Sequence, residues 1–135
     1  MNGFSLDSNN ISFYLKGNAI VKRNIDQRVD ANVKVIVSPF AYYEVKRGLV
    51  DANAARQLRS FDELLRRCPL GEATNAVFEE AVNIHVDLKS KGRICDDMDV
   101  LIAAFCKTYD LTLVTNNTRH FENIRGLVLA DWSAA

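Results

Sequence analysis

Short apolar segments alternate along this chain with longer segments whose apolar residues recur at helical spacing. Val33–Val37 alternates and is rich in β-branched residues, and Leu111–Thr115 is a second strand-like run. Phe4–Leu6 and Leu127–Leu129 are shorter runs of the same character. Strands separated by helices are joined by crossovers, so the pattern predicts an α/β fold. We expect a central, mostly parallel sheet with helices on both faces.

Helix signals fill the segments between the expected strands. Ser38 followed by Pro39 is a strong helix start, because serine caps the first turn and proline already has the φ angle of that turn. Glycine and proline mark the points where several helices stop. The expected helices run from Ser8 or Asn9 to Gly17, from Ala19 to about Val29, from Ser38 to about Gly48, from Asp51 to Arg67, from Glu72 to Lys91, and from Asp96 or Asp97 to Tyr109.

The composition is that of one ordinary globular domain over residues 1–135, with 48% apolar and 25% charged residues and no linker or internal repeat. Basic and acidic residues number 17 each, which excludes a nucleic-acid binder that relies on bulk positive charge. No apolar run approaches the roughly 18 to 20 residues that span a bilayer, and no signal peptide is visible. We therefore expect a cytoplasmic protein without membrane contact.

The three cysteines are odd in number and form no C-x-x-C pair, so neither a disulfide framework nor a thiolate zinc site is indicated. Cys106 lies inside an apolar run and is expected to be buried, as a small hydrophobic residue would be. We predict that Cys68, Cys95 and Cys106 are neither catalytic nor bridged.

Acidic and amide side chains follow the expected strands, where open parallel sheets bind ligands. Asp7 comes directly after the first strand, Glu44 lies about two turns into the helix after the second, and Asn117 follows the third. Asp97 and Asp99 lie at the start of another helix. Clustered carboxylates repel one another unless a cation offsets their charge. Mg²⁺ prefers oxygen ligands and lowers the pKa of a bound water, so the pattern favours metal-assisted hydrolysis of a phosphodiester.

Each of these acids also has a structural explanation. An aspartate at a helix start, such as Asp96 or Asp97, is usually a cap that the helix dipole favours. Glu44 can pair with Arg47 three residues further along an exposed helix face. Asp7 can serve as a turn or cap residue at the end of its strand. Position alone leaves both explanations open.

Several segments together resemble the sequence blocks of PIN-domain nucleases. Leu6–Ser12 is similar to the opening L-D-T-N-x-[IL]-S, and Ser38–Leu49 is similar to the helix that carries the family's glutamate. Asp97–Ala104 followed by Leu113–Phe121 resembles the third and fourth blocks of VapC-like toxins, and Gly126–Trp132 resembles their tail. The likeness extends along essentially the whole chain in the same order.

This resemblance implies a PIN-like three-layer sandwich and an Mg²⁺-dependent endoribonuclease, with Mn²⁺ as an alternative metal. It implies that Asp7, Glu44 and Asp99 are the three acids of the site. Asp97 matches the first acid of the D-x-D variant of the third block and joins them as a metal ligand. Asn117 stands at the fourth acidic position, where its amide can hold a water or the metal without adding charge.

The resemblance also implies the toxin half of a toxin–antitoxin pair, with an RNA substrate, a cognate VapB-like antitoxin and a homodimeric state. Basic residues near the matching blocks are candidates for phosphate contacts, although ordinary solvated charge explains any single one better. These residues are Lys46, Arg47, Arg93 and Arg119.

Two functions of other classes remain as alternatives. A haloacid-dehalogenase-type phosphatase requires a second acid two residues after Asp7, where this chain has Asn9, and a receiver domain requires an aspartate where it has Ser38. A catalytically weak PIN fold that only binds RNA or protein is the other alternative. Asn117 is its one support, and the complete set of three acids argues against it.

Overall fold

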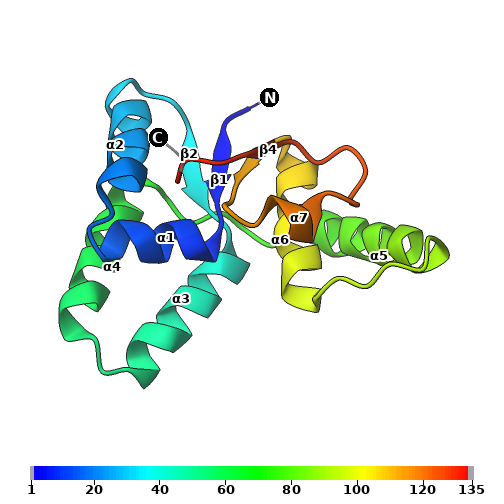
Figure 1. The fold of residues 1–135 in the computed structure, drawn as a ribbon, viewed down its shortest axis with the longest axis horizontal. Helices are drawn as coiled ribbons and strands as arrows, with labels where there is room; N and C mark the ends of the chain where they lie inside the picture. The colour runs from blue at the N-terminus through cyan, green and yellow to red at the C-terminus, as the bar shows by residue number, and fades with distance from the viewer. Residues whose placement is uncertain (1, 134–135) are drawn as a thin grey trace.

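The computed structural model describes residues 2–133, in which one parallel sheet is covered by helices (Figure 1). No helix in this range combines the length and apolar character needed to cross a bilayer. The strands, in the sheet order β2-β1-β3-β4, are β2 (Val35–Val37), β1 (Phe4–Leu6), β3 (Thr112–Val114) and β4 (Leu129–Ala130). The helices are α1 (Ser8–Leu15), α2 (Ala19–Asp30), α3 (Pro39–Asp51), α4 (Ala55–Arg67), α5 (Asn75–Ser90), α6 (Asp97–Tyr109) and α7 (Thr118–Phe121).

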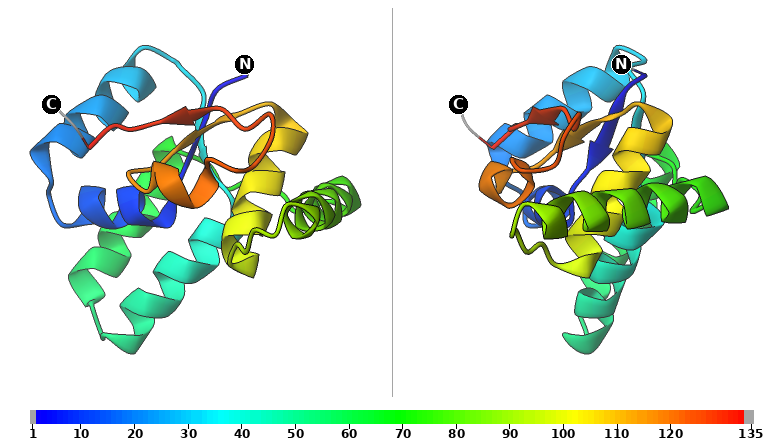
Figure 2. Two further views of the ribbon diagram at one scale, coloured as in Figure 1. Left: turned by 45° about the vertical axis from the view of Figure 1, so that its right-hand side comes forward. Right: turned by 90° about the vertical axis from the view of Figure 1, so that its right-hand side faces the viewer.

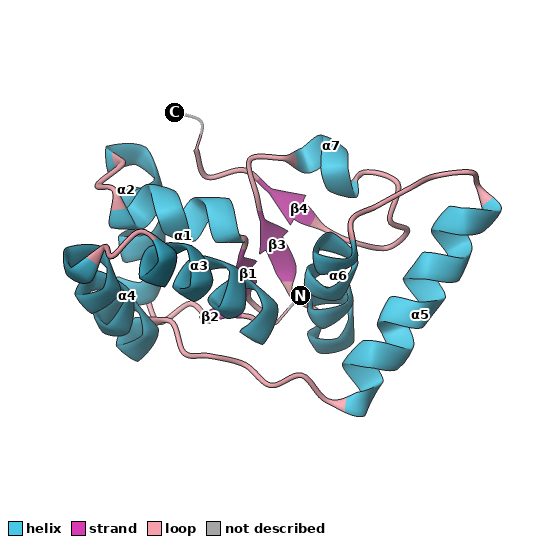
Figure 3. Ribbon diagram, turned by 90° about the horizontal axis from the view of Figure 1, so that it is seen from below, coloured by secondary structure: helices cyan, strands magenta, loops and turns pink. Residues whose placement is uncertain are grey.

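The strands bury both of their faces, because successive side chains point to opposite sides of the sheet. Ile36 packs in a core cluster with α5 and α6, whereas its neighbours Val35 and Val37 pack in a second cluster with α1, α2, α3 and α4. In β3, Leu113 and Val114 divide between the clusters in the same way. Figure 3 shows the two groups of helices on either side of the strands. The predicted three-layer α/β sandwich is confirmed, and all the strand pairs are parallel.

The helix α5 lies outside α6, against which it makes most of its contacts (Figure 2). Its predicted start at Glu72 is wrong, because the preceding segment runs along the sheet edge instead. The Val37 N–H donates to the Pro69 carbonyl oxygen, and the Gly71 N–H donates to the Val37 carbonyl oxygen. These bonds hold the chain extended beside β2, so the helix begins only at Asn75.

The helix predicted from Asp51 to Arg67 is also wrong at its start. Helix α3 continues through Gly48 to Asp51, and the chain turns at Asn53, whose φ of 51° lies in the left-handed region, before α4 begins at Ala55. A glycine inside a helix costs only about 1 kcal/mol, which the packing of α3 against its neighbours outweighs.

The C-terminal strand is displaced from its predicted position at Leu127–Leu129. Strand β4 consists of Leu129 and Ala130, which pair with Leu113 and Val114 of β3. The Leu127 N–H donates instead to a carbonyl oxygen in the turn after α7. Parallel pairing with β3 therefore determines the bounds of this strand, and an apolar run alone does not reveal them.

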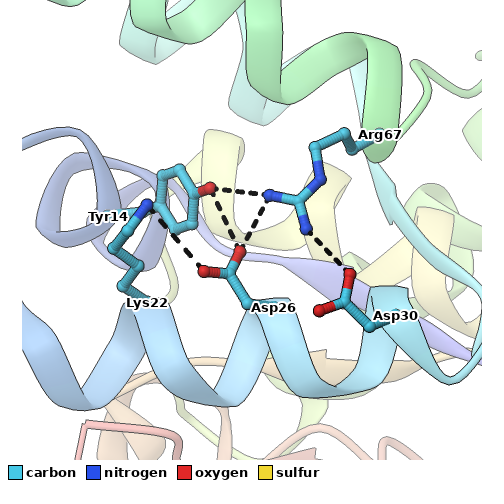
Figure 4. Close-up of polar contacts among 5 residues, drawn as sticks. All are labelled: Tyr14, Lys22, Asp26, Asp30 and Arg67. Carbon is cyan, nitrogen blue, oxygen red and sulfur yellow. Dashed lines mark hydrogen bonds and ion pairs between the residues drawn. The ribbon is translucent and has the colours of Figure 1, made fainter.

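A polar cluster joins three helices on the α1–α4 side of the sheet (Figure 4). The Arg67 guanidinium, at the end of α4, donates to the Tyr14 hydroxyl at 3.0 Å, to Asp26 at 2.8 Å and to Asp30 at 3.5 Å. Lys22 pairs with Asp26 at 3.8 Å and lies over the Tyr14 ring. Partly exposed ion pairs contribute little stability one at a time. Together they set how α1, α2 and α4 lie against one another.

Candidate active site

Asp7 follows β1 directly, and both oxygens of its carboxylate are held. Oδ1 accepts a hydrogen bond from the Ser8 N–H at 2.8 Å, and Oδ2 accepts one from the Thr115 hydroxyl at 2.8 Å. Asp7 is thus the cap of α1, and the prediction of Ser8 or Asn9 as the cap is wrong, because the Asp7 side chain reaches the first free N–H of the helix. The residue is 6% exposed, and burial raises the pKa of Asp7 although both hydrogen bonds oppose the shift.

Glu44 reaches the same region from α3. The Ser8 hydroxyl donates to its Oε1 at 2.6 Å, so Ser8 contacts Asp7 through its N–H and Glu44 through its side chain. Ser38 caps α3 through its side-chain oxygen, as predicted, and so fixes where the helix starts. The sequence analysis left open a structural role for Glu44, as an ion-pair partner of Arg47. In the structure the Arg47 guanidinium instead lies over the Tyr43 ring, 5.0 Å from its centroid.

Asp99 comes from the first turn of α6 and is half-buried. Burial is the largest cause that raises the pKa of Asp99, and the negative charge of Asp7 is the next. The charges of Asp96 and Glu44 raise it further, whereas His120 lowers it. The His120 Nδ1 lies 3.5 Å from Asp99 Oδ2. The charges of Asp7 and Glu44 therefore reach Asp99, beyond the carboxyl ends of the strands, where α1, α3 and α6 begin (Figure 1).

The other two residues predicted for this site lie differently. Asp97 is exposed and lines an apolar groove between α5 and α6, together with Phe78 and His85. Asn117 precedes α7, and its N–H donates at 3.0 Å to the Thr115 hydroxyl oxygen, the same hydroxyl that donates to Asp7. The structure thus connects Asn117 to the acids through Thr115 and places Asp97 toward α5.

Thr115 is the contact that the sequence analysis missed. It is fully buried at the end of β3, and its hydroxyl links the β3 end to the β1 end through Asp7. The available signal was a hydroxyl residue at the carboxyl end of a buried-type strand, since a buried polar group almost always has a hydrogen-bond partner.

The donor set suits a hard divalent cation. Within residues 2–133, no three acidic, histidine or cysteine side chains lie close enough together to form a ready-made metal cluster. Asp7, Glu44 and Asp99 nevertheless offer carboxylate oxygens from three segments, and burial, followed by repulsion from the charges of Asp7 and Glu44, raises the pKa of Asp99. A cation with oxygen preference would offset that repulsion. These residues therefore fit a metal of this class.

The family model of the PIN domain matches residues 6–127, a range that includes the three acids and Thr115. The chain belongs to the PIN domain family. The family inferred from the sequence blocks is confirmed, and so is the PIN-like fold class.

Relatives of this PIN domain extend along its whole length. It is 28% identical over 132 residues to the tRNA(fMet)-specific endonuclease VapC of Shigella flexneri, covering 96% of this chain and 98% of the relative. The solved VapBC2 of Rickettsia felis, bound to a promoter DNA fragment, has a TM-score of 0.88 at 23% identity and covers 96% of this chain and 98% of its own. The DNA-bound VapBC of Salmonella typhimurium has a TM-score of 0.88 at 25% identity, covering 98% and 99%. The VapC-like character is confirmed.

The thiols of this PIN domain are expected to be dispensable for activity. Cys106 is buried as predicted, and the cysteines are free. Burial raises the pKa of Cys68 and Cys95 to about 11, so both remain protonated and weakly nucleophilic at neutral pH. We expect a Cys68→Ala/Cys95→Ser variant to cleave RNA at the parent rate with or without reductant. A rate that follows thiol oxidation would contradict this.

Proposed function

We propose that this PIN domain is an Mg²⁺-dependent endoribonuclease and the toxin of a VapBC-like toxin–antitoxin pair. The observation that carries the proposal is the convergence of Asp7, Glu44 and Asp99 from three segments: Ser8 contacts both Asp7 and Glu44, and burial, then the charges of Asp7 and Glu44, raises the pKa of Asp99. The names of its relatives, which are ribonucleases and a tRNA-specific endonuclease, support RNA as the substrate.

In this proposal Asp7, Asp99 and Glu44 hold Mg²⁺, with Mn²⁺ as an alternative. When bound, the cation polarises the scissile phosphate and lowers the pKa of a coordinated water. Thr115 and Ser8 keep the Asp7 carboxylate in one orientation, and Ser8 does the same for Glu44. Asp97 lines the groove beside α5, so we leave it out of the ligand set.

A cleavage assay with metal removal tests the proposal. The full chain is treated with EDTA, dialysed, and incubated with tRNA and with single-stranded RNA. We expect no cleavage until Mg²⁺ or Mn²⁺ is added. Cleavage that persists without metal would contradict the role of the cation. RNA binding without cleavage even after Mg²⁺ or Mn²⁺ is added would favour the alternative of a PIN fold that only binds RNA.

We further propose a VapB-like antitoxin as the partner, a homodimer as the active form, and the cytoplasm as the location. The solved relatives are VapBC assemblies, which supports the partner. The test is to co-express the chain with the product of the adjacent reading frame. We expect a stable complex that inhibits cleavage, and light scattering of the free chain at the mass of two copies.

We expect Asn117→Ala to reduce cleavage more than His120→Ala does. The Asn117 backbone N–H donates to the Thr115 hydroxyl that holds Asp7, which keeps the residue close to Asp7, and we place its side-chain amide near the metal; the His120 side chain is 61% exposed. Asn117→Asp is expected to retain activity and to bind Mg²⁺ more tightly, because it adds an anionic oxygen. Initial rates at several Mg²⁺ concentrations measure both effects. If His120→Ala removes activity while Asn117→Ala does not, the all-carboxylate mechanism is wrong and the reaction uses the histidine.

A further inference from the structure

Two adjacent tyrosines on α3 have opposite environments. Tyr42 stacks on Phe61, with ring centroids 5.7 Å apart, at the edge of the α1–α4 core. Tyr43 is 52% exposed and belongs to neither core cluster of the described residues. Exposing a large aromatic ring forgoes the stabilisation that burial would give and leaves the face of the ring open to a ligand.

The exposed ring has a cationic neighbour and lies next to a site residue. The Arg47 guanidinium, one helical turn further along, lies 5.0 Å from the centroid of the Tyr43 ring. Glu44 directly follows Tyr43, and Arg47 lies three residues beyond Glu44, a spacing that places them as neighbours on the helix surface. The ring and the guanidinium therefore lie together on the surface of the helix that supplies Glu44 to the site.

We propose that Tyr43 and Arg47 form a nucleotide seat, in which an unpaired base of single-stranded RNA stacks on Tyr43 while Arg47 contacts the adjoining phosphate. Bases of unstacked RNA pack on exposed aromatic rings, and arginine binds phosphate and stacks on planar groups. A duplex offers no free base face to the ring, so the seat selects an unpaired nucleotide beside the cleaved bond. This inference rests on the proposed function.

The charge of the chain is consistent with such a seat. The formal net charge is zero, so bulk positive charge does not hold RNA. Local contacts with phosphate and stacking, which depends little on charge, can add affinity. Tyr43 and Arg47 supply one contact of each kind within one turn of α3.

The experiment measures RNA binding without cleavage. The parent is the full-length Asp99→Asn chain, and the probe is a fluorescently labelled single-stranded oligoribonucleotide in buffer without metal, followed by anisotropy. We expect Tyr43→Leu to raise the Kd by roughly 5- to 150-fold, the range reported by alanine substitution of stacking residues. Tyr43→Phe keeps the ring and is expected to stay within about two-fold of the parent.

Arg47→Ala tests the phosphate contact, and Arg23→Ala on α2 is its matched control with the same loss of charge. We expect Arg47→Ala to weaken binding. The slope of log Kd against log salt concentration should fall by about one, because one fewer counterion is released from the RNA. Arg23→Ala should bind as the parent does. Duplex RNA of the same sequence should bind equally to the parent and to Tyr43→Leu.

The outcomes separate the seat from the proposed function. A parent that binds no RNA even when Mg²⁺ is added would overturn the proposed function, and the seat with it. A parent that binds RNA with the same Kd as Tyr43→Leu would overturn the seat alone. An unchanged Kd together with altered self-association in light scattering would overturn it too, and would make Tyr43 a protein contact.

Discussion

Asp7→Asn and Asp99→Asn are each expected to lower the rate of Mg²⁺-dependent RNA cleavage by more than about 100-fold, since even residues that only support a metal ligand change affinity or activity by 10- to 100-fold. Each substitution removes an anionic oxygen while keeping the size of the side chain. Asp62→Asn, on the exposed surface of α4, is the matched control and should cleave at the parent rate. Wild-type rates in either site variant, at equal metal concentration, would remove that residue from the site.

The same substitutions are expected to stabilise the metal-free protein at neutral pH. Because burial raises the pKa of Asp7 and Asp99 above their ordinary 3.8, the folded chain favours their protonated forms. Their contribution to stability is full below pH 3.8 and is lost as the pH rises through the raised values. Asparagine carries no charge, so the melting temperature should rise at neutral pH and change less in acid. A lower melting temperature at neutral pH would indicate a structural role instead.

Phe105→Ala is expected to lower the free energy of unfolding by about 3–5 kcal/mol, a large share of the roughly 5–15 kcal/mol available to a domain. Phe105 is fully buried in α6, and its ring lies 4.8 Å from that of Tyr109. Truncation leaves a cavity beneath the helix whose first turn carries Asp99. Chemical denaturation measures the loss, and a decrease below about 1 kcal/mol would show that the core closes around the cavity.

Gly71 provides an independent check on that packing. A Cβ at Gly71 would lie 2.5 Å from the tip of the Phe105 ring, so Gly71→Ala forces the ring to shift and should destabilise the fold by about 1–3 kcal/mol. In the Phe105→Ala background the added methyl has room, and the two effects should not add. Additive losses would mean that the residues do not share this space.

Local chemistry explains which parts of the fold could be predicted. The Ser38–Pro39 pair marks a helix start that needs no tertiary contact, and Phe4–Leu6 ends at Asp7 in the structure as in the prediction. Strand β4 depended on which residues meet β3 across the sheet. Such long-range pairing leaves little trace in a short apolar run.

The candidate site residues also divide into those that local sequence could indicate and one whose direction depends on the helix it belongs to. Asp7, Glu44 and Asp99 could be predicted as candidates because Asp7 follows β1, Glu44 lies on the helix after β2, and Asp99 lies in the first turn of α6. Asp97 was predicted as a ligand because it lies at the same helix start as Asp99 and matches the first acid of the D-x-D variant of the PIN-domain block. Once α6 begins at Asp97, however, residues two apart point about 200° from each other around the helix. Helix phase therefore sends Asp97 toward α5, and no motif spacing contains that information.

The bond between Thr115 and Asp7 joins residues 108 positions apart, and β1 pairs with β3 across a similar separation. Trp132 then packs on Phe4, with ring centroids 4.8 Å apart. Contacts of such long range form only after most of the chain is present. At roughly 5–20 residues per second of synthesis, several seconds separate the emergence of Asp7 from that of its partner. A nascent chain on the ribosome therefore carries Asp7 before Thr115 has been made, and we expect it not to attack the RNA around it until Thr115 and the strand before it have emerged.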